Sequence, residues 1–108
     1  MSIEQVKEYL KEFEKENTII ELEQSSATVE LAAQALGVGP ERIAKTLSFK
    51  NGSGALLVVT AGDARIDNKK FKTTFGIKAK MLSPDEVINF TGHKIGGVCP
   101  FGITSPDV

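Results

Sequence analysis

The segment Thr91–Gly102, with the sequence TGHKIGGVCPFG, constrains the fold more than any other part of the chain. It contains four glycines, one proline, and the chain's only histidine and only cysteine. Glycine adopts backbone angles that other residues avoid and lets a ligand approach the main chain, whereas proline fixes its own φ angle. The combination predicts a shaped loop that forms the wall of a pocket. The alternative is an ordinary cluster of surface turns, because the spacing matches no phosphate-loop or dinucleotide motif.

An upstream segment is the expected partner of this loop. Residues 45–49 have the pattern of a β-strand, whose alternation places Lys45 on the same face as Phe49. A turn at residues 51–54 separates this strand from the almost wholly apolar residues 55–61. The two segments are therefore expected to form a hairpin whose second strand is buried on both faces and central in the sheet.

Length and composition indicate one small globular domain, residues 1–108, with a thin core: 41% of the residues are hydrophobic and 25% are charged. A single cysteine cannot form an internal disulfide, which fits a reducing compartment and a cytoplasmic protein. No apolar run is long enough for a signal peptide or a membrane span, so no membrane role is expected.

Charge is distributed unevenly along the chain. The formal net charge of −1 argues against a strong nonspecific nucleic-acid binder. Residues 1–30, however, carry a net charge of −5, whereas residues 65–80 carry +5. Such a polarised surface can dock a polyanion on one face, although both segments could equally be solvated helix faces.

Capping residues and apolar spacing predict four helices, at residues 2–17, 28–37, 67–76 and 83–90, with a short helical turn at residues 40–44. Two further short strands are expected, at residues 18–22 and 78–82. The elements predict an α+β domain.

Several motifs, in this order, carry a resemblance to a known family: LG at 36–37, RIAKTL at 42–47, AGDARID at 61–67 followed by KK at 69–70, TG at 91–92 and GGVCPFG at 96–102. The set resembles the YbaK/ProX/EbsC family of free-standing aminoacyl-tRNA editing domains. That family is related to the editing insertion of bacterial prolyl-tRNA synthetases. The similarity extends from about residue 25 to the end of the sequence.

The resemblance implies a mixed, partly closed β-sheet or barrel with helices packed outside it. It also implies an aminoacyl-tRNA deacylase that edits in trans, hydrolysing the ester between a small amino acid, such as cysteine or alanine, and tRNA for proline. The implied partners are the acceptor end of the aminoacyl-tRNA and prolyl-tRNA synthetase. No cofactor and no metal site belong to the matched pattern.

By position, Lys45 matches the family's pocket lysine, and Gly96 and Pro100 match the ends of its Gly-x-x-x-Pro loop. Lys45, Gly96 and Gly97 are the expected catalytic residues, because main-chain amides beside the glycines can stabilise the ester oxyanion and the lysine can hold a phosphate or orient the ester. The expected substrate-binding residues are Thr46, Val98, Cys99 and Pro100. An ordinary strand-end lysine that bends to solvent is the alternative for Lys45. The attacking group implied by the family is a water, the ribose hydroxyl or the thiol of a cysteinyl substrate.

Other functions stay open. Cys99 could act as a nucleophile with His93 as its base, and Asp63 could pair with Asp67 as acid and base, although a turn residue and a helix cap explain that pair. One histidine and one cysteine fall short of a zinc site.

A second class of function is a tRNA- or synthetase-binding module without catalysis. Members of the family usually continue for several tens of residues past the glycine loop. The chain is therefore expected to be a C-terminally truncated form or fragment that lacks the last strands, or a natural short form that borrows strands from a partner. Exposed strand edges could then support a homo-oligomer.

Overall fold

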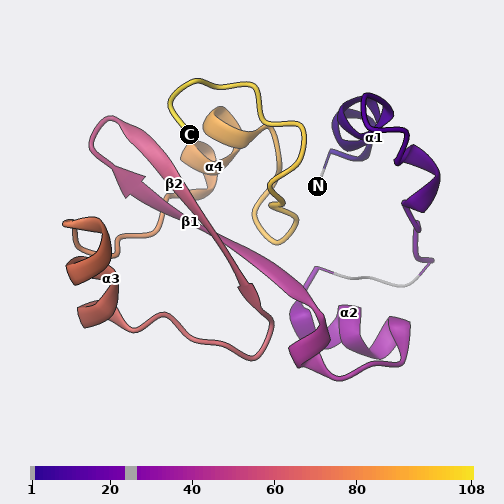
Figure 1. Ribbon diagram of the computed structural model, residues 1–108, viewed down its shortest axis with the longest axis horizontal. Helices are drawn as coiled ribbons and strands as arrows, with labels where there is room; N and C mark the ends of the chain where they lie inside the picture. Colours follow the sequence, from indigo (N-terminus) through magenta and orange to yellow (C-terminus); the bar gives the residue numbers. More distant parts are fainter. Residues whose placement is uncertain (1, 24–26) are drawn as a thin grey trace.

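The computed structural model describes residues 2–23 and 27–108. Along the chain, the helices and strands are α1 (Ile3–Lys11), the 3-10 turn η1 (Glu16–Thr18), α2 (Val29–Leu36), the 3-10 turn η2 (Pro40–Arg42), β1 (Ala44–Asn51), β2 (Gly54–Ala61), α3 (Asn68–Phe75) and α4 (Pro84–Thr91). Figure 1 shows the hairpin crossing the middle of the molecule, with α3 near one end of the long axis and α1 near the other. The predicted α+β class is confirmed.

The sheet is a hairpin of two antiparallel strands, in which pairing runs from Ala44 opposite Ala61 to Asn51 opposite Gly54. Gly52 has a φ of 61°, as a tight turn between antiparallel strands requires. Within the described residues this sheet is open, and it is narrower than the mixed, partly closed sheet that was expected. The hairpin itself is confirmed.

β1, and not β2, is the more central strand in the described part of the chain. The Lys50 amide donates to the Lys80 carbonyl at 2.8 Å, and the Leu82 amide donates to the Ser48 carbonyl at 3.1 Å. The outer edge of β2 has one such bond, from the Ala55 amide to the Asp107 carbonyl at 2.8 Å, and Val59 on β2 is 51% exposed. The prediction that β2 is central and buried on both faces was wrong, because an apolar run does not determine how much of a strand's outer edge is hydrogen-bonded, and β1 has the more extensive pairing there.

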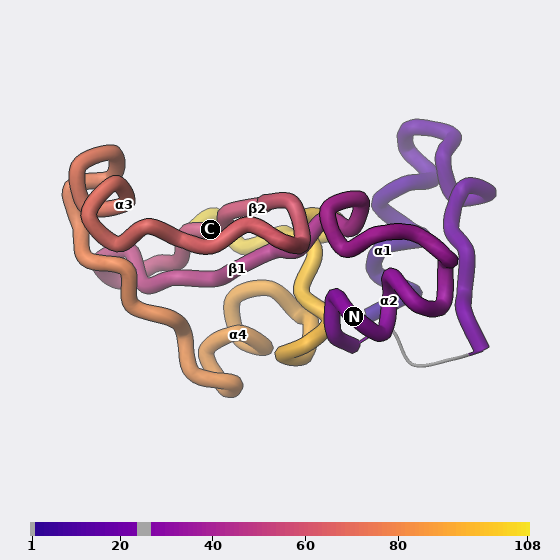
Figure 2. The backbone as a smooth tube through the Cα atoms, turned by 90° about the horizontal axis from the view of Figure 1, so that it is seen from below, coloured from indigo at the N-terminus to yellow at the C-terminus, as the bar shows by residue number. Residues whose placement is uncertain are grey.

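The two faces of the hairpin are covered by different helices. Residues paired across the strands share a face, and Phe49, on the same face as Lys45, packs on Phe71 of α3 with ring centroids 4.7 Å apart. The opposite face packs on α4 through a buried cluster of Ala55, Leu82 and Val87, against which Phe90 and Val98 pack. Figure 2 shows α4 and part of the C-terminal segment on one side of the hairpin.

Two predicted strands and one predicted helix end differ from the structure. Residues 18–22 form no strand in the described chain, and Ile20 is 73% exposed. Residues 78–82 contribute one isolated bridge, between Met81 and Phe49. α1 ends at Lys11, before Glu14 with its positive φ of 55°. Local β-propensity at 18–22 was overridden because no described strand lies beside it to accept its hydrogen bonds.

The other helix ends are where capping chemistry places them. The side chains of Thr28, Asp67 and Ser83 each accept a hydrogen bond from the amide three residues later, at the start of α2, α3 and α4. Gly37, Gly76 and Gly92 end the same helices in the left-handed conformation. These predicted boundaries are confirmed.

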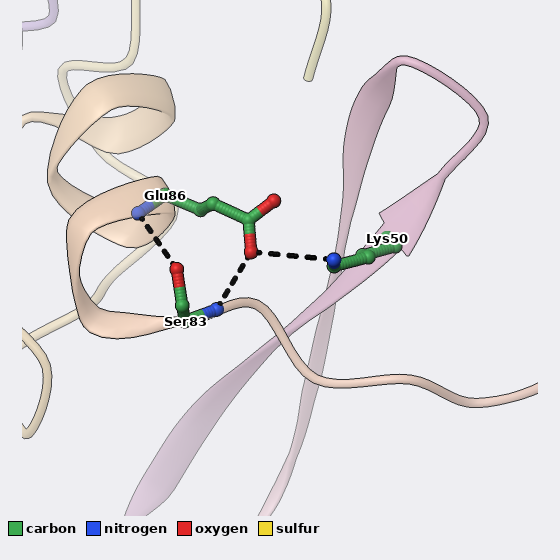
Figure 3. Close-up of polar contacts among 3 residues, drawn as sticks. All are labelled: Lys50, Ser83 and Glu86. Carbon is green, nitrogen blue, oxygen red and sulfur yellow. Dashed lines mark hydrogen bonds and ion pairs between the residues drawn. The ribbon is translucent and has the colours of Figure 1, made fainter.

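The start of α4 is tied to the hairpin by a small polar cluster (Figure 3). Ser83 and Glu86 form a reciprocal capping box, and Glu86 Oε1 lies 3.6 Å from Lys50 Nζ of β1. The hydrogen bond that the Ser83 amide donates to the Glu86 carboxylate is the main cause that holds the pKa of Glu86 below its ordinary value of 4.5, and the Ser83 side chain lowers that pKa further. The carboxylate form of Glu86 is therefore the one that the folded state favours.

We expect Glu86→Gln to lower the free energy of unfolding at pH 7 and to lose this effect in acid. A carboxyl group with a lowered pKa in the folded state stabilises above its unfolded pKa, and the contribution disappears as the pH falls through the folded value. Urea unfolding of the two proteins between pH 7 and pH 3 measures the difference. Asp85→Asn, in the same turn, is the matched control and should show the smaller loss. A Glu86→Gln effect that is independent of pH would contradict the assignment.

Candidate functional site

Lys45 is the second residue of β1, and its half-buried side chain lies on the face that α3 covers. Its ammonium group donates a hydrogen bond to the carbonyl of Ala64, in the segment that links β2 to α3. The amine is thus held against the main chain and does not extend freely into solvent.

Thr60 lies opposite Lys45 in the register of the hairpin, so the two side chains share a face. The Thr60 hydroxyl is buried, and within the described residues it has no hydrogen-bond partner. Buried polar atoms in proteins almost always have a hydrogen-bond partner, so the unpaired hydroxyl of Thr60 is unusual. Sequence reasoning did not single out Thr60. The hairpin turn could have identified it, because the turn fixes the register.

Thr46 lies on the other face, opposite Val59, and also at an open edge of β1. Ser48 and Lys50 direct main-chain groups to the segment 80–82 on that edge. Because strand geometry repeats every two residues, the main-chain groups of Thr46 point to the same side, beyond the part that segment 80–82 covers. Within the described chain nothing pairs with them there. The open edge of β1 lies between the two faces of the hairpin.

The loop from Thr91 to Gly102 depends on glycine at the positions where φ is positive, including Gly96 at 86° and Gly102 at 74°. The Gly97 amide donates to the Lys94 carbonyl at 2.9 Å and closes a turn. The Gly96 amide makes no hydrogen bond to any described residue. Of the two expected amide donors, Gly97 is engaged inside the loop, and Gly96 is available to a ligand.

A single side chain of α1 holds both ends of this loop. Nε2 of Gln5 donates to the Thr91 carbonyl at 2.9 Å and also to the Gly102 carbonyl. A Cβ on Gly102 would lie 2.8 Å from Gln5 Cγ, so the close approach requires glycine. Sequence reasoning missed this role, because nothing local to Gln5 signals a partner so far along the chain.

His93 has no exposed surface, and both of its ring nitrogens are engaged. The Ser2 amide donates to Nδ1 at 3.1 Å, and Nε2 lies 3.0 Å from the Phe101 carbonyl. A carbonyl only accepts, so Nε2 carries the proton and Nδ1 does not. The Sγ atom of Cys99, 3.5 Å from Nε2, therefore faces a donor and not a base. This arrangement favours His93 as a loop residue bonded to backbone over its role in a Cys/His hydrolase.

The remaining loop residues expected to bind substrate differ in exposure. Cys99 is buried, Val98 is half-buried and packs on the α4 side of the hairpin, and Pro100 is exposed. Burial raises the pKa of the Cys99 thiol, which lowers its thiolate fraction near neutral pH.

Lys45 and the glycine loop do not meet directly. By register, Lys45 lies on the α3 face, whereas Val98 packs on the α4 face, and no hydrogen bond or ion pair between described residues joins Lys45 to the loop. The segment at the start of α2 is near both parts: Gly96 lies against the Ala27 carbonyl, and Gly62, which directly follows β2, lies against the Val29 side chain. The two parts of the expected site thus flank the end of the hairpin where β1 begins.

The other chemistry considered from the sequence has simple structural roles. Asp67 caps α3, and Asp63 is exposed in the turn after β2. Among the described residues, no group of three or more His, Cys, Asp or Glu side chains could hold a metal ion. Over the same residues, no helix is both long and apolar enough to cross a membrane.

We expect the Cys99 thiol to react slowly with iodoacetamide in the native protein at pH 7.5. The raised pKa and the burial of Sγ both act against the thiolate, so the rate should rise only at a pH above the range in which a free cysteine, with a pKa of about 8.5, titrates. Mass spectrometry follows the modification, and the same protein in urea provides the fast reference. Native modification as fast as in urea would instead indicate an activated, accessible thiolate.

Comparison with known proteins supports the family resemblance that the sequence motifs carry. The model of the aminoacyl-tRNA editing domain family matches residues 23–108. The chain is 54% identical to the uncharacterized protein YwhH of Bacillus subtilis strain 168, over all of this chain and 70% of that protein. It is 29% identical to the proline–tRNA ligase of Thermotoga maritima, over 89% of this chain and 17% of the ligase.

Its structure is also similar to the crystal structure of a candidate trans-editing enzyme for prolyl-tRNA synthetase. The TM-score is 0.83 at 34% identity, and the match covers 97% of this chain and 68% of the other. The chain belongs to the aminoacyl-tRNA editing domain family.

Proposed function

We propose that this protein is a cytoplasmic aminoacyl-tRNA deacylase that acts in trans. Its substrate is a tRNA for proline that carries a small wrong amino acid, such as cysteine or alanine, and it hydrolyses the ester bond. The observation that carries the proposal is the family match over residues 23–108, which includes both Lys45 and the glycine loop. The relation to the editing region of proline–tRNA ligases supports the choice of tRNA.

The glycine loop supplies the electrostatic part of the mechanism. When the ester is attacked, negative charge develops on its carbonyl oxygen, and a fixed main-chain donor stabilises that charge without reorganisation. The Gly96 amide is such a donor, and the turn that Gly97 closes fixes its direction. Loss of one donor of this kind typically costs about 10²- to 10³-fold in rate.

Lys45 supplies the binding part. The ester and the 5′-phosphate lie at opposite ends of the terminal adenosine, so the groups that bind them need not touch each other. In the proposed complex the nucleoside crosses the open edge of β1 at Thr46, its phosphate meets Lys45 on one face, and the acyl group meets Val98, Cys99 and Pro100 on the other. The Lys45 ammonium exchanges its bond to Ala64 for the phosphate, a partner of opposite charge.

No protein nucleophile is required. A water attacks the carbonyl carbon, or the thiol of a cysteinyl substrate attacks it and closes a thiolactone, while the bond to the tRNA oxygen breaks and that oxygen takes up the proton of the nucleophile. Attack by the neighbouring ribose hydroxyl would shift the acyl group to the other ribose oxygen, from which a water then releases it. Holding the reacting groups in line can supply several of the roughly 7 to 11 kcal/mol available from orientation.

We expect the wild-type protein to release amino acid catalytically from at least one member of a panel of mischarged tRNAs, and Lys45→Ala to lower kcat/KM at least about a hundredfold. The loss follows from removing the charge that holds the phosphate. Release of labelled amino acid, with circular dichroism to verify folding, measures both. Lys11→Ala, an exposed lysine on α1, is the matched control and should keep wild-type activity.

Two results would replace this proposal. Loss of turnover in Cys99→Ser with full activity in Lys45→Ala would assign a Cys/His hydrolase. Salt-sensitive tRNA binding without turnover on any panel member would assign a non-catalytic binding module.

We also expect Thr60→Val to lower deacylation while it maintains or raises stability. Valine matches the shape of threonine, so its substitution removes a buried hydroxyl that lacks a partner, which by itself favours folding. If the hydroxyl meets the substrate beside Lys45, activity falls in the same variant. Thermal unfolding and deacylation rates separate the two effects. Unchanged activity with raised stability would show that Thr60 takes no part in binding.

A further inference from the structure

The segment of residues 65–80, which contains α3, carries six basic residues, together called the basic cluster: Arg65, Lys69, Lys70, Lys72, Lys78 and Lys80. All six side chains are exposed, and within residues 2–23 and 27–108 none takes part in an ion pair. The ion pairs that are described use Lys7, Lys11 and Lys50 instead. The charge of the basic cluster is therefore free to act on a partner.

The surface of α3 is also hollowed. A depression of about 400 Å³ is lined by Asp67, Lys69, Lys70, Thr73 and Thr74. The Asp67 carboxylate already accepts from the Lys70 amide, and the Thr73 hydroxyl donates to the Lys69 carbonyl. The two ammonium groups and the Thr74 hydroxyl are thus the donors that this depression offers, a set that suits a phosphate.

The opposite end of the molecule repels the same ligand. The glutamate-rich residues 1–30, with their net charge of −5, include α1, and Figure 1 shows α1 and α3 near opposite ends of the long axis. That axis measures 38 Å. The distance between the acidic and the basic end is therefore longer than the electrostatic screening length of about 8 Å at physiological salt. The charges at each end consequently act on a polyanion independently of those at the other.

α3 lies at a fixed distance from Lys45 on the same face of the hairpin. The Phe71 ring packs on Phe49, with centroids 4.7 Å apart, and Phe49 is four residues from Lys45 along β1. At about 3.3 Å per residue this is roughly 13 Å. A stacked nucleic-acid strand advances about 3.4 Å per nucleotide, so about four nucleotides cover the same span.

From these observations we infer that the basic cluster on α3 binds the sugar-phosphate backbone of the acceptor end, about four nucleotides before the terminal adenosine. The identity of the RNA rests on the proposed function, whereas the polyanion-binding face rests on the charges and the depression alone. The face contributes affinity and orientation without reading the base sequence.

The first experiment measures binding without chemistry. Lys69→Glu/Lys70→Glu is compared with Lys11→Glu/Lys15→Glu, which makes the same charge change at the α1 end, by fluorescence anisotropy with an uncharged tRNA transcript over a series of salt concentrations. We expect the α3 variant to bind at least about tenfold more weakly, with a salt slope lower by about 1.4 to 1.8, since each phosphate contact contributes about 0.7 to 0.9. The control should stay within about twofold of wild type. Equal losses in both variants, or none in the α3 variant, would overturn the inference.

The second experiment locates the contact along the RNA. On full-length mischarged tRNA the α3 variant should show a raised KM with an unchanged kcat. On an aminoacylated 3′-terminal trinucleotide, which lacks the upstream phosphates, it should match wild type. Equal loss on both substrates would contradict the upstream position. If the wild-type protein binds tRNA as expected but deacylates neither substrate, the proposed function fails while the binding face stands.

Discussion

The arrangement of the whole domain depends on hydrogen bonding along both edges of β1. β2 pairs with the full length of one edge, while the segment 80–82 bonds to Ser48 and Lys50 on the other. These bonds place α4 beneath one face, because Leu82 leads directly into the helix and packs with Val87 and Ala55. The other face is left for α3, which Phe71 fixes on Phe49. A two-stranded hairpin is marginal by itself, and helices on both faces supply the burial that it lacks.

The glycine loop has its own support, which comes from the other end of the chain. Gln5 bonds to both ends of the loop, the Ser2 amide bonds to His93, and the ring of Tyr9 lies 6.0 Å from that of Phe101. All three residues lie outside the range 23–108 that the family model matches. A loop rich in glycine has high conformational freedom when unfolded, so its ordering has to be offset by contacts of this kind. α1 is thus an integral part of the domain, although the family motifs begin after it.

Local signals in the sequence predicted most of the elements. The caps Thr28, Asp67 and Ser83, together with the glycines that end their helices, act within one turn of chain, and the boundaries predicted from them are confirmed. The turn at Gly52 likewise fixed the hairpin. The errors concern the pairing of strand edges: residues 18–22 had strand propensity but no described strand beside them, and β2 is apolar although its outer edge is bonded only where Ala55 meets Asp107 among the described residues.

The candidate site, like the fold, could be predicted only where the signals lie close together in the sequence. The positions of Lys45 and Gly96 in the family pattern came from local motifs, and the register of the turn could have added Thr60. The bonds from Gln5 to Thr91 and Gly102 join residues that nothing in the local sequence relates. Whether Lys45 and the loop share a face also depends on the packing of α3 and α4, which alternation along β1 alone does not determine.

The open edge of β1 at Thr46 has a role in the proposed mechanism. If the segment 80–82 extended its pairing to Thr46, the α3 face and the loop would be separated by a continuous sheet, and one nucleotide could not contact both. Because the pairing stops at Ser48, the main-chain groups of Thr46 have no partner among the described residues, and in the proposed complex an RNA strand that follows the basic cluster along one face passes its terminal ester across the edge to Gly96. Exposed edges usually invite aggregation, and a short edge flanked by Lys45 limits that hazard. In the proposed mechanism, the same edge is both the weak point of the sheet and the route by which substrate reaches the loop.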